Sequence, residues 1–387
     1  MDLSDQGGVP RARIGGEQRV TPLELFFDLV FVFALTQVTA FLTHHLTWIG
    51  MLQGGALLAA LWTVWGGYSW LTNAVPAEEA IPARLLIFCA MAAMFVASLA
   101  VPGAFGRYGV IFGSAYFVVQ LLQVILYALA SGREPERRAI LRLAPGFVGA
   151  PVLLIVAGFF DGFAQGALWA IALAVGYGVA FIRGVSGSRI HPAHFAERHG
   201  LVLIIALGES IVAAGVGVSG LALGTGVIVA VVLGITLAAA LWWAYFDLVM
   251  LVAERRLSEA RGEERARLAL DSYSYLHLPM VAGIIFVALG VKQTLAHVGD
   301  PLGTIPAVAL CGGVALYLLG HNAFRLREEG SVSIPRLVVT MLCLALIPLA
   351  VLVPSLLTLS VLALLLCGLA AFETATSREF RRALRAR

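Results

Sequence analysis

Glu209 is a carboxylic acid inside a long apolar run, a setting in which an ionised side chain is costly. It lies between the apolar segments 201–207 and 211–218, about 18 Å along a helix from Glu197. An ionised group near the centre of a bilayer costs about 2.5–3.5 kcal/mol on insertion scales unless it is paired or hydrated. We therefore expect Glu209 to bind a proton or a monovalent cation. The alternative is a protonated carboxyl that makes a structural hydrogen bond.

Three other polar side chains lie at a similar depth. Ser210 follows Glu209 directly, and Thr36 and Gln37 lie late in the first apolar run of the chain. Together with Glu209 they would form a shared polar layer if the two runs are neighbouring helices.

Two further acids, Glu24 and Asp28, lie one helical turn apart at the start of the first apolar run. Residues 21–24 (Thr-Pro-Leu-Glu) have the form of a capping box, so Glu24 is expected to cap a helix. Capping cannot explain Asp28, which is surrounded by the apolar residues of 26–31. Asp28 must face water or a partner, either in a gate or in a hydrogen bond between helices.

Further polar residues fall within about two turns of one membrane face once the apolar runs are oriented as helices. This predicted layer consists of Glu24, Asp28, Asn73, Glu197, His199, Asp247, His277, His321 and Asn322. We expect His277 to pair with Asp247 or Asp28, because a protonated histidine beside carboxylates forms a pH-sensitive latch. Scattered interfacial side chains are an equally good interpretation of Asn73, His321 and Asn322.

The remaining motifs argue against several classes of protein. His191, His194 and His199 have the spacing of metal ligands, but Pro192 and the loop setting favour a solvated helix start. The segment 253–267 alternates arginine and glutamate, which is typical of a solvated helical extension and not of a nucleic-acid patch. The sequence contains no nucleotide-binding loop, nucleophile elbow or zinc-protease motif. We therefore expect no metal, cofactor, nucleic acid or enzymatic activity.

The elements that must position these residues are membrane helices. Of the 387 residues, 60% are apolar and only 13% are charged, whereas soluble domains are about 45–50% apolar and about 25% charged. The apolar runs recur with lengths of about 20 residues, which suits a helix crossing about 30 Å of hydrocarbon. The four cysteines lie inside these runs without the spacing of a redox or metal motif.

Apolar runs separated by charged residues, proline or glycine predict an all-α polytopic membrane protein with about 12 transmembrane helices. The predicted spans are 23–43, 49–73, 83–101, 107–131, 139–158, 164–183, 198–219, 222–252, 271–292, 303–324, 335–353 and 356–374. With the N-terminus inside, Arg107 and Lys292 alone among the 26 basic residues fall on the outer side. The positive-inside rule therefore predicts that both termini are cytoplasmic.

Weak internal similarity predicts a duplication. Glu24 and Glu197 are 173 residues apart, and the Trp-x-x-Tyr pattern of 65–68 recurs after 177 residues at 242–245. Six spans per half would make the two repeats parallel. We expect a cytoplasmic segment at 1–20, six-helix repeats at 21–190 and 191–376, and a cytoplasmic basic tail at 377–387. Repeats of this kind often place a pathway at their interface.

With these residues in view, the sequence resembles the bacterial low temperature requirement A family. The resemblance rests on residues 21–37 (TPLELFFDLVFVFALTQ), on Trp70-Leu71-Thr72-Asn73, on Glu197-Arg198-His199-Gly200 and on Leu207-Gly208-Glu209-Ser210. It implies a multi-span membrane protein connected with growth in the cold and brings no substrate with it. Residues 26–28 are faintly similar to the Phe-Ser-Asp signature of the bacterial and lysosomal potassium-channel family. Phe27 in place of serine, and Pro22 where that pattern has arginine, argue against transferring its pore chemistry.

These observations predict a secondary transporter or ion-conducting protein of the bacterial cytoplasmic membrane. Glu209 would be the proton or cation site, and Asp28 with His277 or Asp247 would form the cytoplasmic latch. The alternative is a membrane stress sensor or scaffold that transports nothing and whose polar layers only hold helices together. The expected partners are the lipid bilayer and an unknown small solute or ion, with a proton or monovalent cation favoured. Assembly into a homo-oligomer is left open.

Overall fold

The chain folds into helices throughout the part that the structure describes. This computed structural model describes residues 19–74, 80–130, 134–185, 190–219 and 223–376, and its one β-bridge joins Pro301 to Pro354. The predicted terminal segments 1–20 and 377–387 lie almost wholly outside these ranges.

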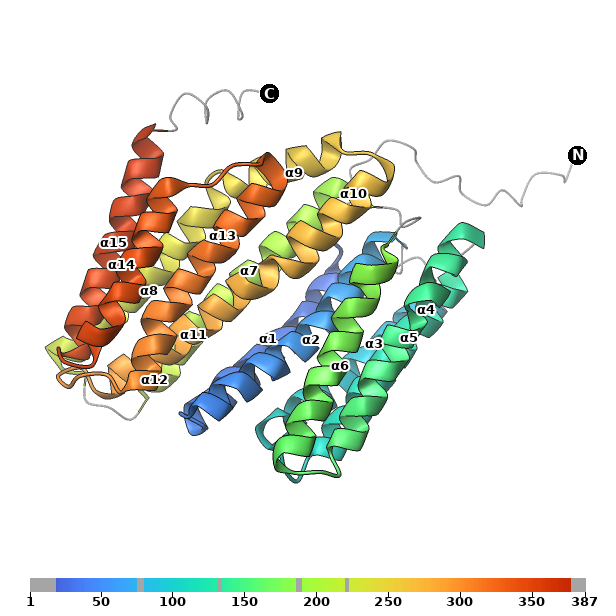
Figure 1. The fold of residues 1–387 in the computed structure, drawn as a ribbon, viewed down its shortest axis with the longest axis horizontal. Helices are drawn as coiled ribbons and strands as arrows, with labels where there is room; N and C mark the ends of the chain where they lie inside the picture. The colour runs from blue at the N-terminus through green and yellow to red at the C-terminus, as the bar shows by residue number, and fades with distance from the viewer. Residues whose placement is uncertain (1–18, 75–79, 131–133, 186–189, 220–222, 377–387) are drawn as a thin grey trace, which may run out of the picture.

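Six long helices form the first half of the molecule (Figure 1). They are α1 (Pro22–His44), α2 (Trp48–Ala74), α3 (Ile81–Ala100), α4 (Gly109–Ala130), α5 (Glu134–Ala157) and α6 (Gly162–Arg183), with a 3₁₀ turn, η1 (Val101–Gly103), after α3. Helix α1 packs against α2 and α3, α3 against α4, α4 against α5 and α5 against α6, and α6 packs back onto α2.

The second half begins with α7 (Pro192–Gly217) and repeats this order of packing. Its further helices are α8 (Thr225–Phe246), α9 (Val249–Glu259), α10 (Gly262–Leu268), α11 (His277–Ala296), α12 (Thr304–Ala307), α13 (Gly313–Glu329), α14 (Ile334–Ala350) and α15 (Ser355–Thr376). Helix α7 packs against α8 and α11, α11 against α13, α13 against α14 and α14 against α15, and α15 packs back onto α8. The π-helical segments η2 (Ala269–Tyr275) and η3 (Val308–Gly312) join α10 to α11 and α12 to α13.

Within the described ranges, ten helices are long and apolar enough to cross a membrane. Each coincides with a predicted span, so a multi-pass membrane protein is confirmed. The two other predicted spans, 139–158 and 335–353, correspond to the shorter apolar helices Leu143–Ala157 and Ile334–Ala350. Twelve crossings and cytoplasmic termini therefore stay predictions.

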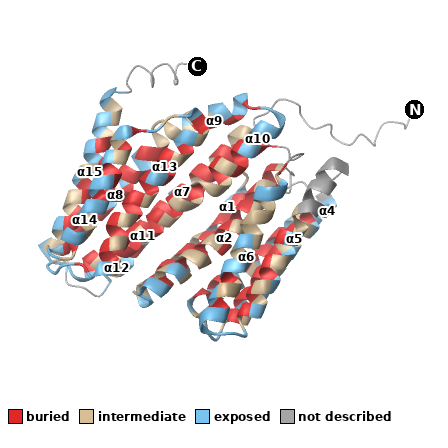
Figure 2. Cartoon of the chain, in the orientation of Figure 1, coloured by how far each residue is buried: buried red, intermediate tan, exposed pale blue. Residues whose placement is uncertain are grey.

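Figure 2 shows that most of the long helices have both buried and exposed residues along their length. Many of the exposed residues are large and apolar, and several polar residues are buried, as expected of a protein surrounded by lipid. In α1, Glu24 and Asp28 are 3% and 2% exposed, whereas Phe26 and Leu29 are 52% and 62% exposed. A water-soluble helix would turn the opposite face outward. The surface of α1 therefore suits hydrocarbon, and its two acids belong to the interior.

Glycines allow some of these helices to approach one another closely, as in other membrane proteins. A Cβ on Gly113 of α4 would lie 2.6 Å from the backbone nitrogen of Ile155 in α5. In the second half, a Cβ on Gly313 would lie 2.7 Å from the carbonyl oxygen of Gly283. The two halves meet along α1 and α2 on one side and α7 and α11 on the other. We call this contact the seam.

Candidate functional site

Helices α1 and α7 lie side by side in the seam and run in the same direction. Glu24 contacts His194, and Asp28 contacts Arg198, both at a separation of 170 residues. Thr36 contacts Glu209 at a separation of 173 residues. A nearly constant separation over three contacts means that the helices are parallel and in register.

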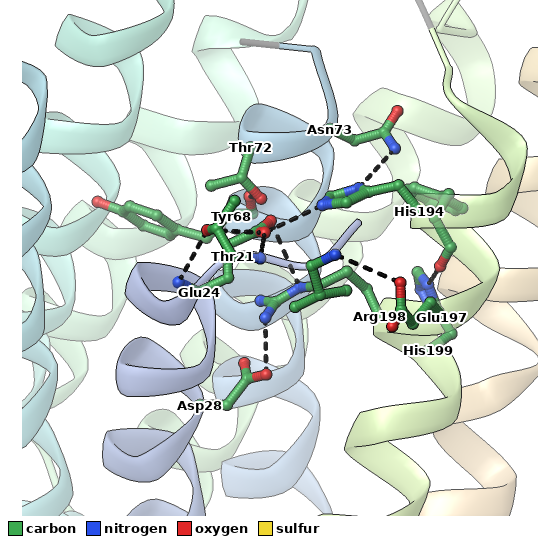
Figure 3. A network of polar contacts seen from close by, with 12 residues as sticks. Thr21, Glu24, Asp28, Tyr68, Thr72, Asn73, His194, Glu197, Arg198 and His199 are labelled. Carbon is green, nitrogen blue, oxygen red and sulfur yellow. Dashed lines mark hydrogen bonds and ion pairs between the residues drawn. The ribbon is translucent and has the colours of Figure 1, made fainter. Parts of the chain in front are cut away.

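Glu24 takes part both in capping and in the seam (Figure 3). Its carboxylate accepts from the Thr21 backbone N–H at 2.9 Å, and the Thr21 hydroxyl accepts in turn from the Glu24 N–H, so the capping box is present. The same carboxylate oxygen lies 3.0 Å from Nε2 of His194. Its other oxygen lies 3.8 Å from Nε of Arg198. One acid thus fixes the start of α1 and joins it to α7.

Asp28 lies one turn deeper, and its partner is Arg198. The guanidinium Nη1 donates to Oδ2 of Asp28 at 2.6 Å, while the Trp65 indole donates to Oδ1 at 3.0 Å. Arg198 is only 1% exposed and also lies over the Trp65 ring. The predicted pairing of Asp28 with His277 is wrong, because both ring nitrogens of His277 bond elsewhere, to Ser272 and Tyr245.

The sequence analysis assigns Arg198 no role at the site, although this residue belongs to the Glu197-Arg198-His199-Gly200 motif of the family resemblance. A signal for it exists in the chain. Pro22 and Pro192 are 170 residues apart. At the same spacing, the acids Glu24 and Asp28 correspond to the basic residues His194 and Arg198. Parallel helices in register bring residues about 170 positions apart together, so the acids of α1 meet basic side chains of α7.

Asn73, at the end of α2, ties the start of α7 to this network. Its side-chain nitrogen lies 2.9 Å from Nδ1 of His194, and its oxygen accepts from the backbone N–H of His191 at 2.9 Å. Glu197, also in the predicted layer, accepts from the backbone N–H of Val20 at 3.3 Å. Both residues therefore hold helix ends together at the seam.

Glu209 is buried deeper in the seam, where the Thr36 hydroxyl donates to its carboxylate at 2.6 Å. Lys292 of α11 interacts electrostatically with this carboxylate and donates to the Thr43 hydroxyl at 3.5 Å. The sequence alone indicates only that Lys292 is a basic residue on the outer side. The predicted layer is thus formed in part.

The other two members of that layer are placed differently. The buried hydroxyl of Ser210 makes no hydrogen bond within the described residues. Gln37 is half-buried on α1. Glu209 and Thr36 therefore carry the direct contact across the seam.

Comparison with known proteins places this geometry in a family. The family model described as bacterial low temperature requirement A protein (LtrA) matches residues 19–371, which include both halves and the whole seam. The chain belongs to the LtrA family. An uncharacterized protein of Rhizobium meliloti (strain 1021) is 32% identical over 311 residues, which cover 77% of this chain and 75% of the relative. No solved structure matches the chain.

Three remaining members of the predicted layer, His199, His277 and His321, belong to a cluster of rings in the second half of this LtrA-family protein, and the cluster touches the seam at Trp65. His199 is buried, and its ring centroid lies 5.0 Å from that of Trp65 and 5.2 Å from that of His277. Nε2 of His277 lies 2.9 Å from the Tyr245 hydroxyl. The predicted pairing of His277 with Asp247 is therefore wrong as well. Asp247 is half-buried at the end of α8.

His321 and Asn322 extend this cluster to the last helices. Nδ1 of His321 lies 2.8 Å from Arg336, whose guanidinium binds both carboxylate oxygens of Glu373 at 2.7 and 2.9 Å. The Asn322 side chain accepts from the N–H of Ser333, the residue before α14, at 2.8 Å. These contacts join helices within one half, so the predicted layer divides into a seam network and a second-half cluster.

The seam brings together charged side chains that are buried between the two halves. Among the described residues, no group of three histidine, cysteine, aspartate or glutamate side chains could hold a metal ion. A small cavity beside Glu24 has room for about one water molecule. It is lined by Leu23, Glu24, Phe27, Tyr68, Thr72, Ile87 and Arg198.

Proposed function

We propose that this LtrA-family protein is a secondary transporter or ion-conducting protein of the bacterial cytoplasmic membrane, with a proton or monovalent cation as the moving species. Its pathway follows the seam between α1 and α7. The observation that carries the proposal is the row of three contacts across the seam, Glu24–His194, Asp28–Arg198 and Thr36–Glu209. No chemical reaction is part of the proposal.

The proposed topology has twelve crossings arranged as two parallel six-helix repeats, with both termini in the cytoplasm. The same order of helix packing in both halves supports the repeats. The parallel register of α1 and α7 supports repeats of the same orientation. The placement of basic residues on one side supports the orientation.

In this proposal the Asp28–Arg198 pair closes the cytoplasmic end of the seam, and Glu209 is the site within it. Attraction between opposite charges is strong where water is excluded. A proton or cation that neutralises Asp28 or Glu24 removes much of the attraction to Arg198, which allows the halves to part. Binding of a proton or cation to these acids is thereby coupled to opening of the seam, as in other proteins with two conformational states.

A second candidate is a stress sensor or scaffold without transport. It is favoured by the completeness of the pairing at Asp28, both of whose carboxylate oxygens have close donors inside the chain. In this alternative the contacts lock the halves together, and the side chains never exchange partners with an ion. The two candidates differ in whether charge crosses the membrane.

Ion flux into proteoliposomes tests the proposal. The full chain is reconstituted, and proton, Na⁺ and K⁺ fluxes are measured at several pH values for the wild type and Glu209→Gln. Glutamine keeps an oxygen that accepts from Thr36 and loses the charge, so we expect a folded protein whose flux falls at least tenfold. Glu259→Gln changes an exposed ion pair on α9 and serves as the matched control, with unchanged flux.

Two outcomes would contradict the proposal. Absence of flux from the folded wild type under every gradient would favour the scaffold. Equal flux in the wild type and in Glu209→Gln would remove Glu209 from the pathway.

A further inference from the structure

A buried carboxylate that forms no ion pair within the described residues lies at the end of α13, away from the seam. Glu328 is 5% exposed, and neither oxygen of its carboxylate has a hydrogen-bond partner within the described residues. A buried charge without a partner is strongly unfavourable. Asp28 and Glu373 differ from it, because each has an arginine side chain within 3.0 Å.

The arginines near Glu328 are engaged elsewhere. Arg327 and Arg256 both act on the Glu328 carboxylate electrostatically. Nε of Arg327, however, binds Asp271 at 2.9 Å, and Arg256 lies 3.7 Å from Glu264. Each arginine therefore forms an ion pair with another acid, and neither forms one with Glu328.

Two buried hydroxyls accompany the carboxylate. The Ser272 hydroxyl lies next to the Glu328 carboxylate without hydrogen-bond geometry. The Tyr273 ring meets the ring of Phe324, one turn before Glu328 on α13, edge-on at 5.6 Å. Tyr273 also interacts electrostatically with Glu328 and with Glu254 of α9. Both hydroxyl oxygens are buried, and neither makes a hydrogen bond within the described residues. Ser272 and Tyr273 belong to the π-helical segment η2, and such segments frequently occur at functional sites.

We infer that Glu328, Ser272 and Tyr273 form a binding site for an alkali-metal cation, Na⁺ or K⁺, at the end of the second half where α9, η2 and α13 meet. The site supplies two carboxylate oxygens and two hydroxyl oxygens, which are hard ligands suited to a hard cation. The cation would neutralise Glu328 and give the hydroxyl oxygens a partner. This inference does not depend on transport through the seam.

The site lies one layer of rings away from the seam. The Tyr273 ring stacks on His277 at 5.2 Å, and it meets the His199 ring edge-on, also at 5.2 Å. His199 is the residue after Arg198 in α7. A cation that orders Tyr273 would therefore also order the rings that pack behind the Asp28–Arg198 pair.

Thermal unfolding of the full chain in detergent tests the inference. The apparent midpoint is measured in NaCl, KCl and choline chloride at equal ionic strength. A cation that binds only the folded state raises the midpoint by about 2 °C at ten times its dissociation constant. We expect a saturable rise in Na⁺ or K⁺ for the wild type, and none in choline.

Substitutions of the proposed ligands show whether the cation that raises the unfolding midpoint binds at this site. Glu328→Gln should abolish the rise, whereas Glu329→Gln, an exposed neighbour paired with Arg325, should keep it. Tyr273→Phe and Ser272→Ala each remove one oxygen and should raise the half-saturating concentration several-fold, even if Glu328→Gln fails to fold. Equal midpoints in all three salts, a rise that persists in Glu328→Gln, or unchanged half-saturation in both hydroxyl variants would overturn the inference.

Discussion

Arg198 is the residue on which the seam network depends. It is buried, it contacts acids on two successive turns of α1, and it lies over the Trp65 ring. A planar guanidinium suits this position, because it presents several donors in a fixed geometry and stacks on aromatic rings. Lysine would offer a single point charge in its place.

Asp28→Asn should destabilise the protein, because it leaves Arg198 buried beside one acid at 3.8 Å and without its close partner. Breaking a buried ion pair from one side costs about 3–5 kcal/mol. We expect a clear fall in the apparent unfolding midpoint, measured by intrinsic fluorescence in detergent. The exposed Arg255–Glu259 pair provides the control, since Glu259→Gln should change the midpoint little.

The double variant Asp28→Asn with Arg198→Met should recover part of this loss, since it removes the unpaired charge. Equal midpoints for Asp28→Asn and the Glu259→Gln control would show that the Asp28–Arg198 pair contributes nothing to stability.

At the scale of elements, close contact between helices depends on glycines whose neighbours are backbone atoms. Besides its approach to Gly283, a Cβ on Gly313 would lie 2.9 Å from the backbone nitrogen of Val287. Backbone atoms of α11 cannot rotate away as side chains do, so the helices would have to separate. Gly178 of α6 has open space at the same position.

Gly313→Ala should therefore lower stability by about 1–3 kcal/mol, the usual cost of overpacking. Gly178→Ala should be neutral, or stabilising by up to about 1 kcal/mol, because alanine is the better helix former. Apparent unfolding midpoints of the two variants in the same detergent give the comparison. A loss of stability in Gly178→Ala as large as that in Gly313→Ala would contradict the argument from close approach.

At the scale of the whole molecule, two helical bundles with the same packing order meet through their first helices. The parallel register of α1 and α7 places the starts of both halves on one side of the membrane. The connection between the halves then requires an even number of crossings in the first half. That number is six if Leu143–Ala157 crosses the membrane.

Reporter fusions test this topology. A fluorescent protein fused after Arg387 should fluoresce, whereas alkaline phosphatase should be active when fused in the loop after His45 or after Phe160. The number of crossings follows from the loops on either side of Leu143–Ala157, which should report opposite sides. The same side for both loops would mean that this helix does not cross, and the twelve-span topology would be wrong.

Much of the molecule could be predicted from the sequence, because the relevant signals are local. The length of each apolar run predicts a membrane protein. Residues 21–24 predict the start of α1 and its capping box, which the structure contains. The sequence also indicates that Asp28 faces water or a partner and that Glu209 lies deep within an apolar run, and both side chains are buried in the structure. Partners were harder to predict, as His277 shows. It was assigned to Asp28 or Asp247, but it bonds to Ser272 and Tyr245.

The sequence by itself therefore determined which segments are apolar helices and which polar side chains within them need a partner. Only the tertiary structure decided that Arg198 is the partner of Asp28 and that Thr36 is a partner of Glu209. It also decided that Glu328 makes no hydrogen bond within the part of the chain that the structure describes. The reason is physical. Spacing along the chain fixes which residues share a helix face, whereas the neighbour of that face depends on how helices about 170 residues apart pack, rotate and align.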